Sequence, residues 1–285
     1  MPRRFSRRSL VCYGPLALLL RAPLRAQTPL TGVIDIHAHS DPDSVPRSID
    51  AIDLARLAKA RGMRALVLKN HFEPTAALAY IVRKEVPGIE ILGGIVLNRT
   101  VGGVNPAAVE HMVQVKGGWG RVVWMPTFDA GGPLPIPELK QVAALAAKHH
   151  LTLETGHAPA AQGLVILREA RLAGVERMVV THGMLSPIGM SIPQMKEASS
   201  LGAYIEFVFN GVYGKGKQFE MGDYARVIHA VGPAHCILSS DMGQAGNPLP
   251  PDGLLLFFEG LRNAGISQTH IDMMSKTNPA RVLGL

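Results

Sequence analysis

The sequence has little cysteine, and what it has excludes a disulfide scaffold. Its two cysteines are Cys12 and Cys236. Cys12 falls in an N-terminal segment that we expect to be removed, and Cys236 lies in the apolar run Cys236–Leu238, where a buried, unreactive thiol is expected. The mature chain therefore has no internal disulfide, and cysteine usage does not indicate the redox compartment.

Acidic residues are absent from the first 26 positions, and the apolar run there, Val11–Leu20, is too short to cross a bilayer. Six arginines accompany it, a combination typical of a processing segment. Ser6–Leu10 resembles the twin-arginine export motif of bacteria, and Leu24–Ala26 provides a cleavage site before Gln27. We expect an export signal at residues 1–26 and one mature periplasmic domain at residues 27–285. A basic N-terminus on a cytoplasmic protein is the alternative.

The mature part also lacks an excess of charge of one sign. The whole chain has a net charge of +7, but six of its 29 basic residues lie in the first 26 positions, which leaves 23 basic and 22 acidic residues. No basic stripe and no alternation of aromatic and basic residues is present, so nucleic acid is excluded as a partner. We expect a small-molecule substrate and no membrane span in the mature chain. The oligomeric state stays open, a homo-oligomer included.

Short apolar runs alternate with longer amphipathic stretches along the mature chain, which predicts repeated strand–helix units and a parallel sheet. The expected strands are Val33–Ile36, Ala65–Lys69, Ile89–Leu97, Arg121–Met125, Leu151–Glu154, Arg177–Thr181, Ala203–Phe209 and His235–Ser240. The expected helices are Ile49–Arg61, Pro74–Val86, one that begins at Asn105–Pro106, Pro137–His149, Ala158–Ala173, Pro193–Leu201, Phe219–Val231, Leu254–Asn263 and Pro279–Leu283.

Eight strand–helix units predict an α/β fold of the (β/α)8 TIM barrel type, and about 259 mature residues suit one such domain. A doubly wound open sheet is the alternative. It is disfavoured because no glycine-rich turn with dinucleotide-binding spacing follows any strand.

Imidazole and carboxylate side chains gather where the expected strands end. In a TIM barrel the active site lies at the carboxyl ends of the strands, so these residues are expected to converge. His37 and His39 are two residues apart on the first strand, a spacing that points both rings to one side. Imidazole is the commonest protein ligand for zinc-like metals. The complete set at strand ends is His37, His39, Lys69, His71, His157, His182 and Asp241.

In these positions the chain resembles the amidohydrolase superfamily of metal-dependent barrel enzymes. That family has His-x-His on strand one, a histidine after strands five and six, and an aspartate after strand eight. The matching residues here are His37, His39, His157, His182 and Asp241. The resemblance, to a little-characterised branch, implies a divalent metal, most readily zinc, with one or two ions and with manganese, iron or cobalt as alternatives.

The chain departs from the two-metal members of that superfamily at strand four. Those members carry a bridging carboxylated lysine or glutamate there, whereas this strand ends in Trp124–Thr127. Lys69, at the end of strand two, could bridge two ions if it were N-carboxylated. A single-metal site or an unmodified lysine is slightly favoured over that interpretation. Glu154 and Glu206 suit the bridge less, because Glu154 is out of phase with His157 and Glu206 fits a barrel-interior or substrate contact.

The expected chemistry is attack by a metal-activated water on an amide, lactam, lactone or related ester. A carboxylate beside a cation stays ionised, so Asp241 is the expected general base, a role that the resemblance also implies. His182 would bind a second metal or polarise the substrate carbonyl. Non-oxidative decarboxylation or hydration of a small carboxylic acid is the alternative reaction, and a ligand-binding barrel without turnover is a third. The residues expected at the substrate are His71, Arg47, Asn98, Trp124 and Thr127.

Overall fold

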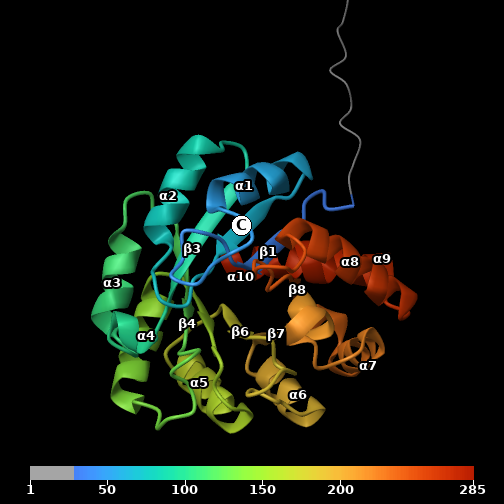
Figure 1. Cartoon of the computed structure of the whole chain (residues 1–285). Coiled ribbons are helices and arrows are strands. Elements are labelled where there is room, and N and C mark those ends of the chain that lie inside the picture. Colours follow the sequence, from blue (N-terminus) through green and yellow to red (C-terminus); the bar gives the residue numbers. More distant parts are fainter. Residues whose placement is uncertain (1–28) are drawn as a thin grey trace, which may run out of the picture.

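Eight parallel strands form the wall of a barrel and follow one another around it in chain order (Figure 1). The structure is a computed structural model that describes residues 29–285, so the expected export signal at residues 1–26 lies outside the described residues. The strands are β1 (Ile34–Ala38), β2 (Ala65–Leu68), β3 (Glu90–Val96), β4 (Gly120–Trp124), β5 (Thr152–Glu154), β6 (Met178–Val180), β7 (Ala203–Val208) and β8 (Cys236–Ser239).

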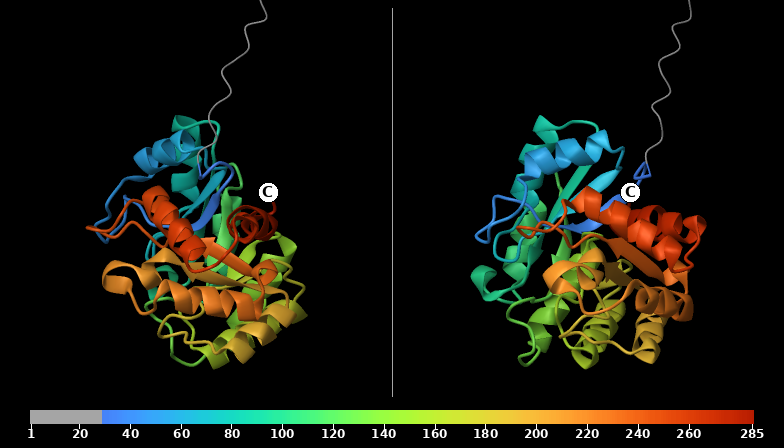
Figure 2. Two further views of the ribbon diagram at one scale, coloured as in Figure 1. Left: turned by 90° about the vertical axis from the view of Figure 1, so that its right-hand side faces the viewer. Right: turned by 45° about the vertical axis from the view of Figure 1, so that its right-hand side comes forward.

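A helix follows each strand, and these helices surround the sheet (Figure 2). They are α1 (Ala51–Ala60), α2 (Ala76–Glu85), α3 (Pro106–Gln114), α4 (Ile136–Lys148), α5 (Ala160–Leu172), α6 (Ile192–Ser200), α7 (Met221–Val231) and α8 (Pro250–Asn263). The predicted (β/α)8 barrel is therefore confirmed. Within residues 29–285, no helix is both long enough and apolar enough to span a membrane.

The sequence placed the elements in the right order but missed some of their ends. Helix α8 begins at Pro250, four residues before the expected Leu254, because proline is compatible with the first turn of a helix. The short helix α9 (Gln268–Asp272) and the π-helical turn Met273–Thr277 were not predicted. These two segments and helix α10 (Asn278–Leu283) follow one another without a break, and the π-helical turn shifts the period of about 3.6 residues on which a helix prediction depends.

The barrel interior is apolar at one end and polar at the other. Ile34, Ile36 and neighbouring strand residues form an inner core, which the C-terminal helix α10 joins through Val282 and Leu283. The Thr152 hydroxyl, at the start of β5, donates to the Val282 carbonyl at 2.7 Å. Helix α10 therefore closes the amino-terminal end of the barrel, and the polar residues are left at the opposite rim.

Strand β1 contains a bulge that sets the direction of the two histidines. Asp35 pairs with Leu66 of β2 while Ala38 pairs with Leu68, so β1 has one extra residue between them. Ile36 packs in the inner core and Ala38 packs in the outer core between sheet and helices. Strict alternation would point His37 outward, and the bulge instead turns it into the barrel.

The carboxylate of Asp35 holds this bulge and the seam between β1 and β8. Its Oδ1 accepts hydrogen bonds from the backbone N–H groups of His37 and Ser240, both at 3.1 Å. Backbone bonds continue the seam, with Asp241 N–H donating to the His37 carbonyl at 2.8 Å. Asp35 thus ties the first histidine to the end of β8.

We expect Asp35→Ala to lower the free energy of unfolding by about 2–6 kcal/mol, because two buried N–H groups lose their acceptor at roughly 1–3 kcal/mol each. Asp35→Asn retains one carbonyl oxygen and should lose less than half as much. Urea denaturation of the two variants measures the difference. Equal losses would show that Asp35 does not act as this acceptor.

Candidate metal centre

Six side chains predicted for a metal site meet at the carboxyl ends of the strands. Five of them line a cavity of about 860 Å³, its open mouth included, while Lys69 is fully buried behind that lining. Two come from β1, and the others follow β5, β6 and β8. The five lining residues are His37, His39, His157, His182 and Asp241.

Three of these residues converge on one point. The Nε2 atoms of His37 and His39 lie 3.2 and 3.1 Å from Oδ1 of Asp241. Among the described residues, the ligand atoms of these three side chains all lie within 4.8 Å of one another. All three residues are buried. Although burial acts to raise it, the pKa of Asp241 lies well below its usual range because His37 and His39 interact with the carboxylate.

The proton on His39 can be located from its partners. Its Nδ1 lies 2.7 Å from the backbone carbonyl of Lys69, which can only accept, so Nδ1 carries the hydrogen. Burial lowers the pKa of His39 to about 4, which leaves Nε2 with a lone pair at neutral pH. That lone pair faces the carboxylate of Asp241. Two facing electron-pair donors repel each other unless a proton or a metal ion lies between them, and the nitrogen and carboxylate ligands here suit a divalent metal ion.

Glu206 of β7 fixes the orientation of His37. Its carboxylate oxygens lie 3.2 and 3.3 Å from Nδ1 of His37, and one of them accepts from the backbone N–H of His182 at 2.9 Å. Burial and Lys69 act to lower the pKa of His37, but Asp241 and Glu206 raise it above its usual value. A proton and a metal ion therefore compete for Nε2 of His37. A carboxylate behind a metal-binding histidine is a frequent supporting arrangement.

His157 and His182 form a second pair of imidazoles next to the first. Their Nε2 atoms lie 3.1 Å apart, and the ring of His182 stacks 5.9 Å from that of His37. Burial lowers the pKa of His157 to about 2 and that of His182 to about 4, so both rings are neutral. Neutral imidazoles with facing nitrogens are suited to share a second cation.

Lys69 lies beside His37. Its Nζ is 2.9 Å from Nε2 of His37 and 5.4 Å from the ring centre of Trp124. Burial lowers the pKa of Lys69, while Asp241, Glu154 and Glu206 oppose that change. Burial, followed by repulsion from Glu206, also raises the pKa of Glu154 to about 8. An ammonium at this distance would repel a divalent ion on His37, so an occupied site requires Lys69 to be neutral or carboxylated.

Two of the five predicted substrate residues, Arg47 and His71, line the cavity. Arg47 is held by an ion pair with Asp43 at 2.6 Å. The other three, Asn98, Trp124 and Thr127, are buried and are not among the residues that line the cavity. Trp124 packs in the inner core, because its position on β4 points into the barrel.

Some residues at the cavity were missed from the sequence. Phe128 and Gln244 lie in loops that follow strands, and Asn210 lies in the 3-10 helical turn Phe209–Val212 directly after β7. Asn210 donates to Oδ2 of Asp241 at 3.2 Å, and Gln244 donates to the backbone carbonyl of Asp241 at 2.8 Å. Loops lack the periodicity from which contacts can be predicted. Their position directly after a strand was the one available indication.

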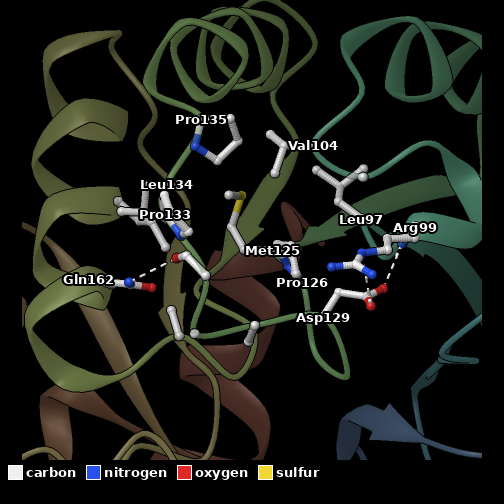
Figure 3. Close-up of a pocket in the computed structure, with 16 residues that line it drawn as sticks. Leu97, Arg99, Val104, Met125, Pro126, Asp129, Pro133, Leu134, Pro135 and Gln162 are labelled. Atoms are coloured by element: carbon white, nitrogen blue, oxygen red, sulfur yellow. Dashed lines mark hydrogen bonds and ion pairs between the residues drawn. The ribbon is translucent and has the colours of Figure 1, made fainter.

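A separate cavity lies between the loops after β3 and β4 and helix α5 (Figure 3). Its lining is mostly apolar and includes Leu97, Met125 and Leu134. The polar side chains at its edge bind other protein groups, since Arg99 pairs with Asp129 and Gln162 donates to the Gly132 carbonyl. Its lining contains no histidine, and its one carboxylate, Asp129, is paired with Arg99, so the candidate site is the histidine-lined cavity.

Solved structures with the same fold include several hydrolases. The phosphotriesterase homology protein of Escherichia coli, complexed with phosphate, has a TM-score of 0.65 and 18% identity, with 88% of this chain and 98% of that chain covered. A putative 2-pyrone-4,6-dicarboxylic acid hydrolase from Pseudomonas putida has a TM-score of 0.63 and 18% identity, with 90% and 98% covered. An organophosphorus hydrolase mutant from Deinococcus radiodurans has a TM-score of 0.62 and 17% identity, with 90% and 95% covered.

These likenesses confirm the predicted (β/α)8 fold. No curated protein matches the sequence. A family profile matches more than half of the chain, in two segments that cover residues 32–135 and 133–206. The chain therefore belongs to the family described as Family of unknown function (DUF6282).

Proposed function

We propose that this protein is a metal-dependent hydrolase that cleaves an amide, lactam, lactone or related ester of a small molecule. The observation that carries the proposal is the convergence of His37, His39 and Asp241 at the carboxyl-terminal rim of the barrel. Two structural neighbours are described as hydrolases of a pyrone and of organophosphorus compounds. This chain has the same fold as those two proteins, and metal-binding side chains line its cavity.

His37, His39 and Asp241 would hold one divalent ion, most readily zinc. When bound, such an ion lowers the pKa of a coordinated water from about 15.7 toward 7. Asp241 stays ionised beside it, orients the water, accepts its proton and passes it to the leaving group. Asn210 holds the second oxygen of Asp241, which keeps the carboxylate in position for that transfer.

We further propose a centre of two ions with Lys69 as the bridge. A neutral amine reacts with carbon dioxide to give a carbamate and release one proton, and burial favours the neutral form of Lys69. His157 and His182 supply the second pair of nitrogens, and Lys69 is close enough to affect the pKa of both. A carboxylated Lys69 would supply two oxygen ligands in addition to the nitrogens of these imidazoles.

Lys69→Ala is expected to reduce the metal content from two ions per chain to one or fewer, because the bridge is lost. Elemental analysis of protein purified with zinc measures this ratio. Lys196→Ala, at an exposed position of α6, is the matched control and should keep two ions. Two ions in Lys69→Ala would contradict the bridge, and one ion in the wild type would favour a single-metal centre.

The experiment that tests the proposed reaction is metal analysis followed by a screen of amides, lactams, lactones, esters and aromatic acids. We expect hydrolysis that is lost with a chelator and restored by zinc. Release of carbon dioxide from an acid, without hydrolysis of any ester or amide, would instead establish a decarboxylase. We also propose that residues 1–26 direct export to the periplasm, which fractionation of expressing cells would test.

A further inference from the structure

His71 differs from the neighbouring histidines in the partner of its Nδ1 atom. In His37 and His39, Nδ1 faces a carboxylate and a carbonyl, so in the neutral ring Nδ1 carries the hydrogen and Nε2 has the lone pair. In His71, Nδ1 lies 3.0 Å from the hydroxyl oxygen of Thr127, which can either donate or accept. The proton arrangement of His71 therefore depends on what else binds Thr127.

The side-chain amide of Asn98 determines whether the Thr127 hydroxyl donates or accepts, because the orientation of that amide is defined by its partners. Its Oδ1 accepts from the backbone N–H groups of Thr127 at 2.8 Å and Asp129 at 3.3 Å. Nδ2 is consequently the opposite end, and it donates to the His71 carbonyl at 2.9 Å and to Oγ1 of Thr127 at 2.8 Å. Asn98 is fully buried, and its amide makes these four bonds.

The Thr127 hydroxyl accepts from Asn98 and still has its own proton to donate. Within residues 29–285, the acceptor that lies within hydrogen-bonding distance of that proton is Nδ1 of His71. Thr127 is buried, so leaving its proton without an acceptor would cost free energy. Thr127 therefore donates to His71, and the hydrogen of the neutral ring resides on Nε2. A protonated ring would also carry a hydrogen on Nε2, so the conclusion holds in either charge state.

We propose that His71 presents its Nε2–H to the cavity as a fixed hydrogen-bond donor for a substrate oxygen, with its tautomer set by Thr127 and Asn98. The ring lines the cavity and stacks on His39 at 5.0 Å, so the donor lies next to the proposed metal ligands. Within the described residues, no protein group is hydrogen-bonded to Nε2 of His71. Thr127 and Asn98 act as positioning residues.

This role deepens the proposed function and depends on it for the identity of the substrate oxygen. Hydrolysis of a carbonyl compound places negative charge on that oxygen in the transition state, and a pre-positioned donor stabilises the charge. A metal-ligand role would need the lone pair of Nε2, so the tautomer separates the two roles. His71 would thus select substrates with a carbonyl or similar oxygen beside the scissile bond.

The tautomer can be measured without any substrate. Long-range proton–nitrogen spectra of full-length, zinc-loaded protein with nitrogen-15-labelled histidine distinguish the two neutral forms, and His71→Phe identifies the His71 signals by their loss. We expect the Nε2–H form in the wild type and in Thr127→Ser, which keeps the hydroxyl. We expect Thr127→Val to lose that preference. An Nδ1–H form in the wild type would overturn the proposal, whatever reaction the protein catalyses.

Inorganic phosphate is the probe that tests whether His71 binds a ligand oxygen atom. We expect phosphate to shift the His71 Nε2 resonance, and His71→Phe to weaken phosphate binding at least 10-fold with unchanged zinc content. An unshifted resonance, equal affinity in His71→Phe, or loss of zinc from that variant would each overturn the proposal. Failure of the proposed hydrolysis would appear separately, as absent turnover of p-nitrophenyl acetate and lactones by the wild type. If turnover is present, His71→Phe should lower kcat/KM about 100-fold.

Discussion

Asp241→Asn is expected to lower kcat by about 10²–10⁴-fold, the usual contribution of a general base, while the protein stays folded. The amide cannot accept the proton of the attacking water. It can keep one oxygen toward His37 and His39, so much of the metal should remain. Asp241 has a φ of 49°, in the left-handed region that asparagine tolerates better than most residues, so the backbone should be retained. Turnover, zinc content and thermal unfolding of the same sample measure these three effects.

The matched control is Asp53→Asn on α1, whose side chain is 59% exposed. It changes the net charge equally and should leave turnover unchanged. Full activity in Asp241→Asn would show that Asp241 is not the general base. Loss of all metal from that variant would show that its principal role is as a ligand.

His39→Ala is expected to weaken zinc binding by more than the roughly 10–100-fold that loss of a supporting residue behind a ligand causes. The variant removes one of the three proposed metal ligands and leaves His37 and Asp241. Zinc should then no longer raise the melting temperature at concentrations that stabilise the wild type, because that gain follows the ratio of free metal to its dissociation constant. Calorimetric titration and thermal unfolding with and without zinc provide the measurements.

His229→Ala, at an exposed position of α7, is the control for loss of a histidine elsewhere and should bind zinc as the wild type does. The chelator-treated wild type gives the baseline for a metal-free barrel. Equal zinc affinity in His39→Ala and His229→Ala would contradict the proposed centre.

The barrel could be predicted because its strands are buried on both faces. Such strands appear as short apolar runs, and the helices between them show a clear polar and apolar face. Once eight units are counted, residues that end the strands must meet at one rim, which is why His37, His182 and Asp241 could be grouped across some 200 positions of sequence.

The residues that orient the site histidines through hydrogen bonds could not be predicted in the same way. Glu206 stands out as a charge within the apolar strand β7, but nothing local indicates that its partner is His37. Asn98 and Thr127 follow two neighbouring strands, and the sequence does not distinguish a residue in the cavity from one behind it. The bulge in β1 also escaped prediction, because an extra residue changes pairing without changing composition.

The sequence by itself determined the architecture and the inventory of metal-binding residues at the rim, since both follow from periodicity and from the order of elements along the chain. The tertiary structure alone decided which nitrogen of each imidazole faces the cavity. That choice depends on the acceptors and donors at the other nitrogen: Glu206 for His37, the Lys69 carbonyl for His39 and the Thr127 hydroxyl for His71. Hydrogen bonds between residues distant in sequence are set by packing, and packing is not encoded in any local pattern.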